Sequence, residues 1–185
     1  LDKSEAPKGA LITGDDMKKV LEEYGLPKSG KVLDQAERLA DEVPTLAAWK
    51  DGQGELRNYQ RIKSRLGERL TWIGGVGDDH VSGYYGIGIR RFTSSISSVA
   101  PKLPILLHEA GASRDEETLA ELTDRHVLPL YNLRTRCKGY EVSAMKALLD
   151  LRGMAGGPVR PPLVDLKPEE REELEPILDG WKEFL

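Results

Sequence analysis

The stretch Leu46-Ala-Ala-Trp-Lys-Asp-Gly-Gln-Gly54 decides the fold, because a short apolar run ends at Lys50 and passes directly into a glycine turn. Such a run between turn residues is typical of a buried strand in a parallel sheet. Lys50 then lies at the carboxyl end of its strand, where ligands bind in parallel α/β folds. A lysine amine among apolar neighbours loses hydration of its charged form, so the neutral amine becomes available to form a Schiff base. The alternative is a solvated lysine at a strand end.

The same pattern of apolar stretch, glycine-rich or small-residue turn and amphipathic segment repeats as far as Pro101. Strands are predicted at residues 46–50, 70–74 and 92–96, with helices at residues 55–65 and 79–86 between them. Strand alternating with helix predicts parallel βα units, and Asp78 and Asp79 are expected to begin the second of these helices.

Helices are predicted to dominate the rest of the chain. They are expected at residues 103–111, 115–130, 140–153 and 168–185, with an extended proline-rich connector at residues 156–162. Asp115 with Thr118, and Pro168 followed by acidic residues, are plausible helix starts. Near the front, helices are expected at residues 13–24 and 32–42. The predicted organisation is an N-terminal helical segment (1–45), a partial (β/α) barrel (46–112) and a C-terminal helical subdomain (113–185).

The composition of the 185 residues favours one sizeable core in a soluble α/β protein, since 39% are hydrophobic and 31% charged. A net charge of −4 gives no general attraction to nucleic acid or to an anionic membrane. Neither a membrane span nor a signal peptide is recognised, so a cytoplasmic location is expected. The single Cys137 excludes an internal disulfide. Three scattered histidines make no metal set, and neither a metal nor another cofactor is expected.

Several motifs, in order along the chain, resemble the second half of the 5-dehydro-4-deoxyglucarate dehydratases, which belong to the dihydrodipicolinate synthase and N-acetylneuraminate lyase superfamily. The motifs are Glu37-Arg-Leu-Ala40, Lys50-Asp-Gly52, Gly74-Gly75, Thr93-Ser-Ser95 leading to Ala100-Pro101, and Gly156-Gly-Pro-Val-Arg-Pro-Pro-Leu163. The resemblance runs from about residue 31 to about residue 172.

This resemblance implies a (β/α)8 barrel whose sixth strand carries the Schiff-base lysine at Lys50, followed by strands seven and eight and a helical tail. It also implies a reaction. The lysine condenses with the ketone of 5-dehydro-4-deoxyglucarate, and the resulting iminium acidifies the neighbouring carbon. Loss of a proton and of a hydroxyl, with decarboxylation, gives 2,5-dioxopentanoate. A protonated imine is a far better electron sink than a ketone, so this chemistry needs no metal.

Further site residues follow from the same resemblance. Tyr24 precedes Lys50 at a spacing that suits the superfamily's proton-relay tyrosine at the end of strand five, although the residues before it predict a helix. The alternative for Tyr24 is a tyrosine at a helix end. Gly75, Thr93 and Ser94 match strand-end positions that line the substrate pocket, or else serve only in turns and strands. Bare backbone and hydroxyls can hydrogen-bond a polyhydroxy acid without crowding it.

The chain is shorter than the roughly 250 residues of a complete barrel. It is therefore expected to be a fragment or deletion form, one part of a split barrel, or a remnant that binds a partner without catalysis. The expected partners are a small oxo acid, either 5-dehydro-4-deoxyglucarate or a pyruvate-like acid, and other chains. These chains would form a homo-oligomer or supply the missing barrel half. The alternative functions are a non-catalytic half-barrel subunit or binding protein, and a pyruvate-dependent aldolase or synthase of the same superfamily.

Overall fold

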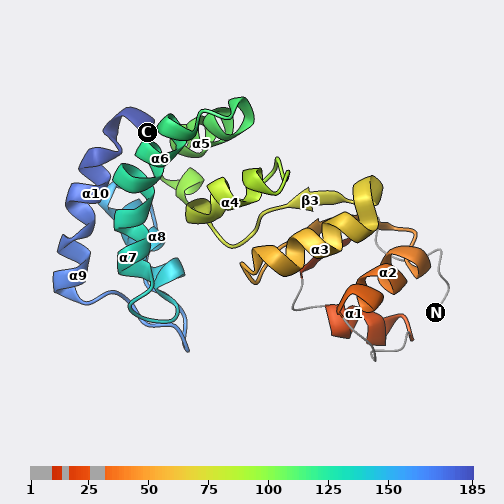
Figure 1. Cartoon of the computed structure of the whole chain (residues 1–185). Coiled ribbons are helices and arrows are strands. Elements are labelled where there is room, and N and C mark those ends of the chain that lie inside the picture. The colour runs from red at the N-terminus through yellow and green to blue at the C-terminus, as the bar shows by residue number, and fades with distance from the viewer. Residues whose placement is uncertain (1–9, 14–16, 26–31) are drawn as a thin grey trace. The chain divides into compact units, whose positions relative to one another are not determined.

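Parallel strands β1 (Ala10–Thr13), β2 (Leu46–Lys50) and β3 (Thr71–Ile73) form a sheet in that order, and β3 is labelled in Figure 1. The structure is a computed structural model that describes residues 10–13, 17–25 and 32–185. In the register of the sheet, Lys50 lies between Thr13 of β1 and Ile73 of β3. The parallel pairing confirms the βα units expected from the sequence.

The strand β1 corrects the prediction that the first 45 residues are helical. Four residues, Ala10–Thr13, form a strand that pairs with β2. So short an apolar run carries almost no periodic signal, and its strand conformation depends on the hydrogen bonds that β2 supplies. The two helices expected at the front are present as α1 (Met17–Glu23) and α2 (Val32–Glu42).

The strand predicted at residues 92–96 is also corrected. Only Phe92 continues the sheet, through a parallel bridge to Gly74. The Gly74 N–H donates to the Arg91 carbonyl at 2.8 Å, and the Thr93 N–H donates to the Gly74 carbonyl at 2.9 Å. Ile96 instead begins a short 3-10 turn, η5 (Ile96–Ser98), which the local serines favour by bonding to nearby backbone groups.

Two compact units divide the described chain. The first, which we call the sheet unit, extends to Val76 and includes Gly83–Thr93. The second, which we call the helical unit, consists of Gly77–Ser82 and Ser94–Leu185. The helical unit therefore begins well before the boundary at residue 113 that the sequence suggested. Helix α5 (Lys102–Ser113) packs against α6 (Glu116–Leu122), which places it with the tail.

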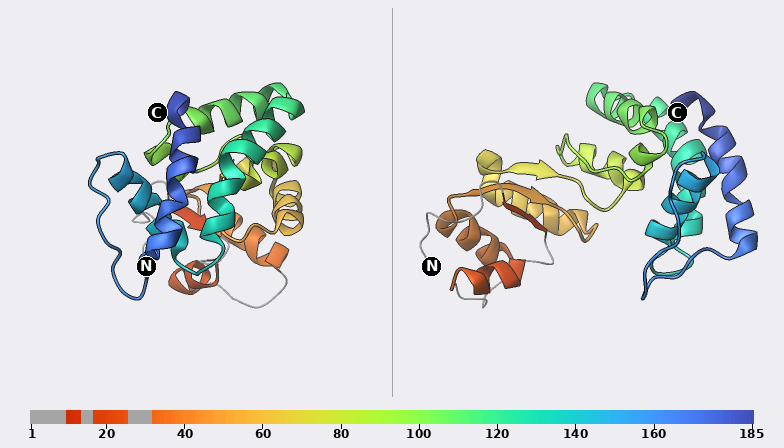
Figure 2. Two further views of the ribbon diagram at one scale, coloured as in Figure 1. Left: turned by 90° about the vertical axis from the view of Figure 1, so that its left-hand side faces the viewer. Right: turned by 180° about the vertical axis from the view of Figure 1, so that it is seen from behind.

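Helix α3 (Leu56–Leu66) lies alongside β3 in Figure 1 and in the right view of Figure 2, and it buries Tyr59, Ile62 and Leu66. These positions are spaced by three and four residues, which places them on one helical face. Trp49 of β2 stacks on Trp72 of β3 at 6.4 Å between ring centroids, and Tyr59 meets Trp72 edge-on at 5.7 Å. The unit is completed by η3 (Gly67–Arg69) and by most of α4 (Val81–Gly86), which follows the turn η4 (Asp78–His80).

The helical unit contains the predicted tail helices, with one interruption. A π-turn, η6 (Thr123–Val127), separates α6 from α7 (Leu128–Arg134), where one continuous helix was expected. The remaining elements are α8 (Tyr140–Leu151), α9 (Pro168–Glu172), α10 (Leu174–Gly180) and η7 (Lys182–Phe184). In Figure 2, α10 runs beside α7 and α8, and the fully buried Trp181 donates its indole N–H to the His126 carbonyl at 2.8 Å.

Helix starts in this unit agree with the sequence. Asp115 caps α6 by accepting the N–H and the hydroxyl hydrogen of Thr118, and these bonds lower the pKa of its carboxyl. Pro168 begins α9. None of the helices in the described ranges is long and apolar enough to cross a membrane.

Glu170 ties α9 to α8 through a buried hydrogen bond. The Tyr140 hydroxyl donates to Glu170 Oε2 at 2.6 Å, and the Lys167 N–H donates to the same oxygen at 3.1 Å. The bond from Tyr140 lowers the pKa of the Glu170 carboxyl, while it raises the pKa of Tyr140 to about 12. The stabilisation is thus present above the unfolded glutamate pKa of about 4.3 and is lost as the pH falls through the lower folded value.

We expect Glu170→Gln to reduce the pH dependence of stability between about pH 5 and pH 3, since a glutamine cannot titrate. The amide oxygen can still accept from Tyr140, so the variant should lose less stability on acidification than the wild type. Urea unfolding at pH 7 and pH 3.5, followed by circular dichroism, measures this difference. Glu169→Gln, at an exposed neighbouring position, is the control. An equal loss on acidification in Glu170→Gln and wild type would contradict the assignment.

Candidate functional site

Lys50 is the last residue of β2, and its side chain is half-buried. Successive residues of a strand point to opposite faces, so Lys50 lies on the face opposite Trp49. Trp49 stacks on Trp72, and Trp72 in turn meets Tyr59 of α3, so Trp49 lies on the side covered by α3. The Lys50 side chain therefore points away from α3, on the face of the sheet that would line the interior of a closed barrel.

Gly75 provides the surface against which the Lys50 side chain lies. A Cβ atom at position 75 would come 2.5 Å from Lys50 Cε and 2.6 Å from Lys50 Cγ, and it would also collide with the Asp51 carbonyl oxygen. No side chain larger than hydrogen fits there without moving the lysine. The structure thus brings together two of the residues that the sequence singled out.

Asp51, directly after Lys50, is buried and holds the turn that follows the strand. Its Oδ1 accepts the Gln53 N–H at 3.0 Å, and its Oδ2 accepts the Gly54 N–H at 3.2 Å. This local arrangement of an aspartate with the N–H two residues later is a common turn motif. Because the Asp51 N–H also donates to the Ile73 carbonyl at 2.9 Å, the turn is fixed to β3.

Tyr84 connects Asp51 with the loop that follows β3. Its hydroxyl donates to Asp51 Oδ2 at 2.9 Å and accepts the N–H groups of Gly75 at 3.3 Å and Val76 at 3.2 Å. Burial raises the pKa of the Tyr84 hydroxyl, and the nearby Asp51 carboxylate raises it further. The hydroxyl therefore stays protonated at neutral pH and serves as a hydrogen-bond bridge.

The Tyr59 hydroxyl also connects the ends of β2 and β3, through their backbone groups. It lies 2.8 Å from the Trp49 carbonyl and 2.9 Å from the Ile73 carbonyl, and it accepts the Ile73 N–H at 3.0 Å. Burial raises the pKa of Tyr59. The last residues of β2 and β3 are thus held in register by a tyrosine from α3 and a tyrosine from α4.

Thr93 and Ser94 occupy different surroundings. Thr93 belongs to the sheet unit, is exposed, and is held through its N–H to Gly74. Ser94 belongs to the helical unit, where its Oγ accepts the Ser97 N–H at 3.1 Å. Burial raises the pKa of the Asp78 carboxyl, and the nearby Ser94 hydroxyl partly offsets this rise. The Ser94 hydroxyl is therefore engaged in holding the turn η5.

Tyr24 is not at the end of a strand. It lies in the turn after α1, which ends at Glu23, and its side chain is half-buried. The strand that precedes β2 in the sheet is β1, which ends at Thr13. The strand-end position inferred from spacing is wrong, because the chain between β1 and β2 contains α1 and α2 and Tyr24 falls within that connection.

Asp51, Tyr84 and Tyr59 were not recognised as site residues from the sequence. The signal for Asp51 was available, because an aspartate that precedes two glycines at a strand end predicts an Asx-type turn. Tyr84 and Tyr59 lie in helices far along the chain from Lys50, so only the tertiary fold reveals their contacts. In the part of the chain that the structure describes, no group of histidine, cysteine and acidic side chains is arranged to hold a metal ion.

A family model, the dihydrodipicolinate synthetase family, matches residues 11–180 of this chain. The chain is 40% identical over 147 residues to a protein named 5-dehydro-4-deoxyglucarate dehydratase from Pseudomonas putida. That match covers 78% of this chain and 48% of the relative, so the chain spans about half the length of this curated relative.

Solved structures show the same fold at low identity. A dihydrodipicolinate synthase from Bacillus clausii superposes with a TM-score of 0.76 at 18% identity, covering 92% of this chain and 62% of that chain. An N-acetylneuraminate lyase from Proteus mirabilis superposes with a TM-score of 0.70 at 22% identity, covering 87% of this chain and 52% of that chain.

We expect Tyr84→Phe to lower the free energy of unfolding by about 1–3 kcal/mol, because it leaves Asp51 with one donor fewer and the N–H groups of Gly75 and Val76 without their acceptor. Tyr85→Phe is the neighbouring-tyrosine control, because the bond of the Tyr85 hydroxyl to the Arg90 carbonyl, at 3.4 Å, is longer than the 2.9 Å bond from Tyr84 to Asp51. Urea unfolding of both variants measures the difference. Equal losses would show that the Tyr84 hydroxyl contributes nothing particular.

Proposed function

The chain belongs to the dihydrodipicolinate synthetase family, and we propose that it carries the Schiff-base half of a lyase that acts on 5-dehydro-4-deoxyglucarate. The observation that carries the proposal is the Lys50 side chain lying over Gly75 at the carboxyl ends of β2 and β3. The relative from Pseudomonas putida, named for this activity, supports the choice of substrate.

The chemistry begins with the neutral Lys50 amine attacking the ketone carbon of the oxo acid. Water leaves, and an iminium forms between the Lys50 nitrogen and that carbon. The positive nitrogen draws electrons from the adjacent C–H bond, so a proton is released and the hydroxyl one carbon further on is expelled with it. Decarboxylation and hydrolysis of the imine then release 2,5-dioxopentanoate, carbon dioxide and the free lysine.

The surroundings of Lys50 are suited to holding the amine in one place. Asp51 and Tyr84 fix the backbone at both neighbouring strand ends by neutral and charge-assisted hydrogen bonds. Positioning of this kind accelerates a reaction because the reacting groups do not have to be ordered at each turnover. We assign Asp51 and Tyr84 to positioning, and Gly75 to leaving room for the lysine and the bound acid.

We also assign Thr93 to substrate binding. Its exposed side chain follows the Phe92 bridge at the edge of the same sheet, and a hydroxyl there can hydrogen-bond a polyhydroxy acid. Ser94 remains a candidate only in a secondary role, since its hydroxyl already accepts the Ser97 N–H. Tyr24 lies in the turn after α1 and not at a strand end, so we assign it no role as a proton relay.

A first test traps the imine. Incubation with 5-dehydro-4-deoxyglucarate and borohydride should add the reduced substrate to the peptide that contains Lys50, as measured by intact mass and peptide mapping. Lys50→Arg should abolish the adduct, because a guanidinium does not form a Schiff base under these conditions. Lys63→Arg is the control and should retain the adduct, because Lys63 lies in α3 and not beside Gly75.

A parallel incubation with pyruvate separates the dehydratase from a pyruvate-dependent enzyme of the same superfamily. The acid that labels Lys50 faster identifies the substrate class. The absence of an adduct with either acid on a folded chain would contradict catalysis by this polypeptide and favour a non-catalytic half-barrel subunit. Labelling that persists in Lys50→Arg would assign the imine to another lysine.

Gly75→Ala provides an independent prediction. The added methyl group would collide with the Asp51 carbonyl oxygen and with the Lys50 side chain, so both must shift, and we expect the rate of adduct formation to fall at least about tenfold, which corresponds to about 1.4 kcal/mol in the barrier. Gly86→Ala is the matched control, because a Cβ there meets no atom within 4 Å. Trapping rates that are the same in both variants would show that Gly75 does not position the lysine.

A further inference from the structure

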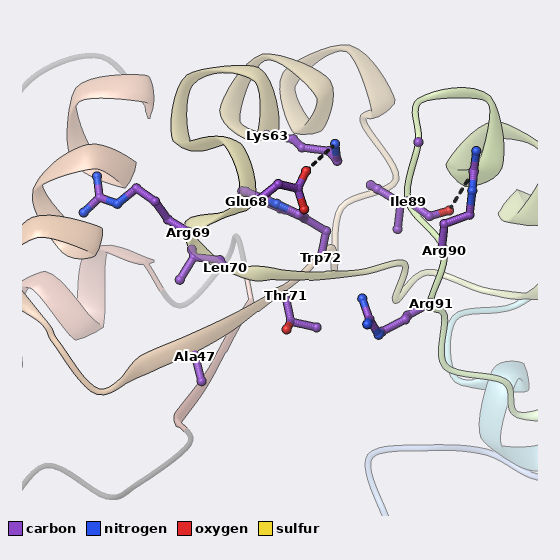
Figure 3. Close-up of a pocket in the computed structure, with 11 residues that line it drawn as sticks. Ala47, Lys63, Glu68, Arg69, Leu70, Thr71, Trp72, Ile89, Arg90 and Arg91 are labelled. Carbon is purple, nitrogen blue, oxygen red and sulfur yellow. Dashed lines mark hydrogen bonds and ion pairs between the residues drawn. The ribbon is translucent and has the colours of Figure 1, made fainter.

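A pocket of about 320 Å³ lies in the sheet unit, at the amino ends of β2 and β3 (Figure 3). Ala47 and Thr71, near the starts of these strands, contribute to its wall, whereas Lys50 occupies the other end of β2. The wall is completed by the end of α3, by η3 and by the segment Gly88 to Arg91. This hollow is therefore separate from the Lys50 site.

The lining of this pocket is strongly basic in a chain whose net charge is −4. It contains the basic side chains Lys63, Arg69, Arg90 and Arg91 and the single acidic side chain of Glu68. Asp41, outside the lining, pairs with Arg69 at 2.7 Å. Four basic groups against two acidic ones leave an excess of two positive charges. Such a concentration favours an anion that carries two negative charges.

Two of the four basic groups are occupied elsewhere. Arg69 points toward Asp41, and Arg90 donates to the Tyr85 carbonyl at 2.6 Å with its guanidinium 5.1 Å from the Tyr85 ring. Figure 3 shows both side chains directed away from the middle of the pocket. They contribute positive potential to the site but are not expected to contact a ligand directly.

Of the four basic side chains, Lys63 and Arg91 are the two that can contact a ligand directly. Lys63 pairs with Glu68 at 3.5 Å, but the Glu68 side chain is 87% exposed, and an ion pair of this kind is weak in water. Arg91 makes no side-chain hydrogen bond or ion pair with any of the described residues, and Figure 3 shows it reaching across toward Thr71. Its backbone is fixed because its carbonyl accepts the Gly74 N–H.

We propose that this pocket binds the phosphate group of a small phosphorylated metabolite, with Arg91 and Lys63 as its cationic ligands and the Thr71 hydroxyl as a neutral donor. A guanidinium presents paired N–H donors that match phosphate oxygens, and an ammonium adds a compact charge. The volume of about 320 Å³ exceeds what a bare phosphate needs and lies at the small end of metabolite pockets.

Calorimetric titration of the full chain with glucose 6-phosphate, inorganic phosphate and succinate tests the proposal. We expect glucose 6-phosphate to bind with a Kd of about 1 mM or tighter at low salt, and to bind more weakly as salt is added. Inorganic phosphate should bind at the same place, and an equal affinity would identify free phosphate as the ligand. Succinate, a dianion without a phosphate group, should bind at least about tenfold more weakly than glucose 6-phosphate.

Arg91→Gln should weaken binding of glucose 6-phosphate at least about tenfold, and Lys63→Gln should also weaken it. Arg61→Gln, an exposed arginine of α3 outside the lining, is the matched control and should bind as the wild type does. Circular dichroism confirms that each variant is folded. Absence of binding at about 10 mM ligand, equal binding of succinate, or unchanged affinity in both Arg91→Gln and Lys63→Gln would overturn the proposal.

Discussion

The hydrogen bond from Tyr84 to the buried carboxylate of Asp51 is the interaction on which the candidate site depends. A carboxylate that is taken out of water is costly unless its oxygens are matched by donors. Here the donors are the Tyr84 hydroxyl and the N–H groups of Gln53 and Gly54. Because the same hydroxyl accepts the Gly75 N–H, satisfying the carboxylate also fixes the strand end beside Lys50. The backbone position of Lys50 therefore depends on the hydrogen bonds that satisfy the neighbouring Asp51 carboxylate.

Local sequence predicted the elements whose signal lies within a few residues. The strand at Lys50, the helix α3 and the helix starts at Asp115 and Pro168 were all predicted, because apolar periodicity and capping residues are local properties. The parallel arrangement also followed, since strand and helix alternate. The strand β1 was missed, because its four residues become a strand only by pairing with β2.

The candidate site was predictable only in part, for a related reason. Lys50 and Gly75 were recognised from a motif, and the structure places them against each other. Tyr24 was assigned by counting residues back from Lys50, and such counting fails where helices of unknown length intervene. Tyr84 is 33 positions from Asp51 in the chain, so nothing in its own neighbourhood indicates the bond that it makes. Side chains that position others are harder to predict than those that react.

The two ends of the parallel strands are stabilised by different physics. At the carboxyl ends, Tyr59 and Tyr84 bury their hydroxyls against backbone groups, and such bonds are little affected by salt. The amino ends also carry exposed ion pairs, such as that of Arg69 with Asp41, and dissolved ions screen these pairs. An exposed ion pair of this kind can exchange its carboxylate for another anion without breaking the buried bonds at the carboxyl ends. The buried bonds beside Lys50 and the exposed charges around Arg91 are therefore separate sets of interactions within one small sheet, so a change in one need not disturb the other.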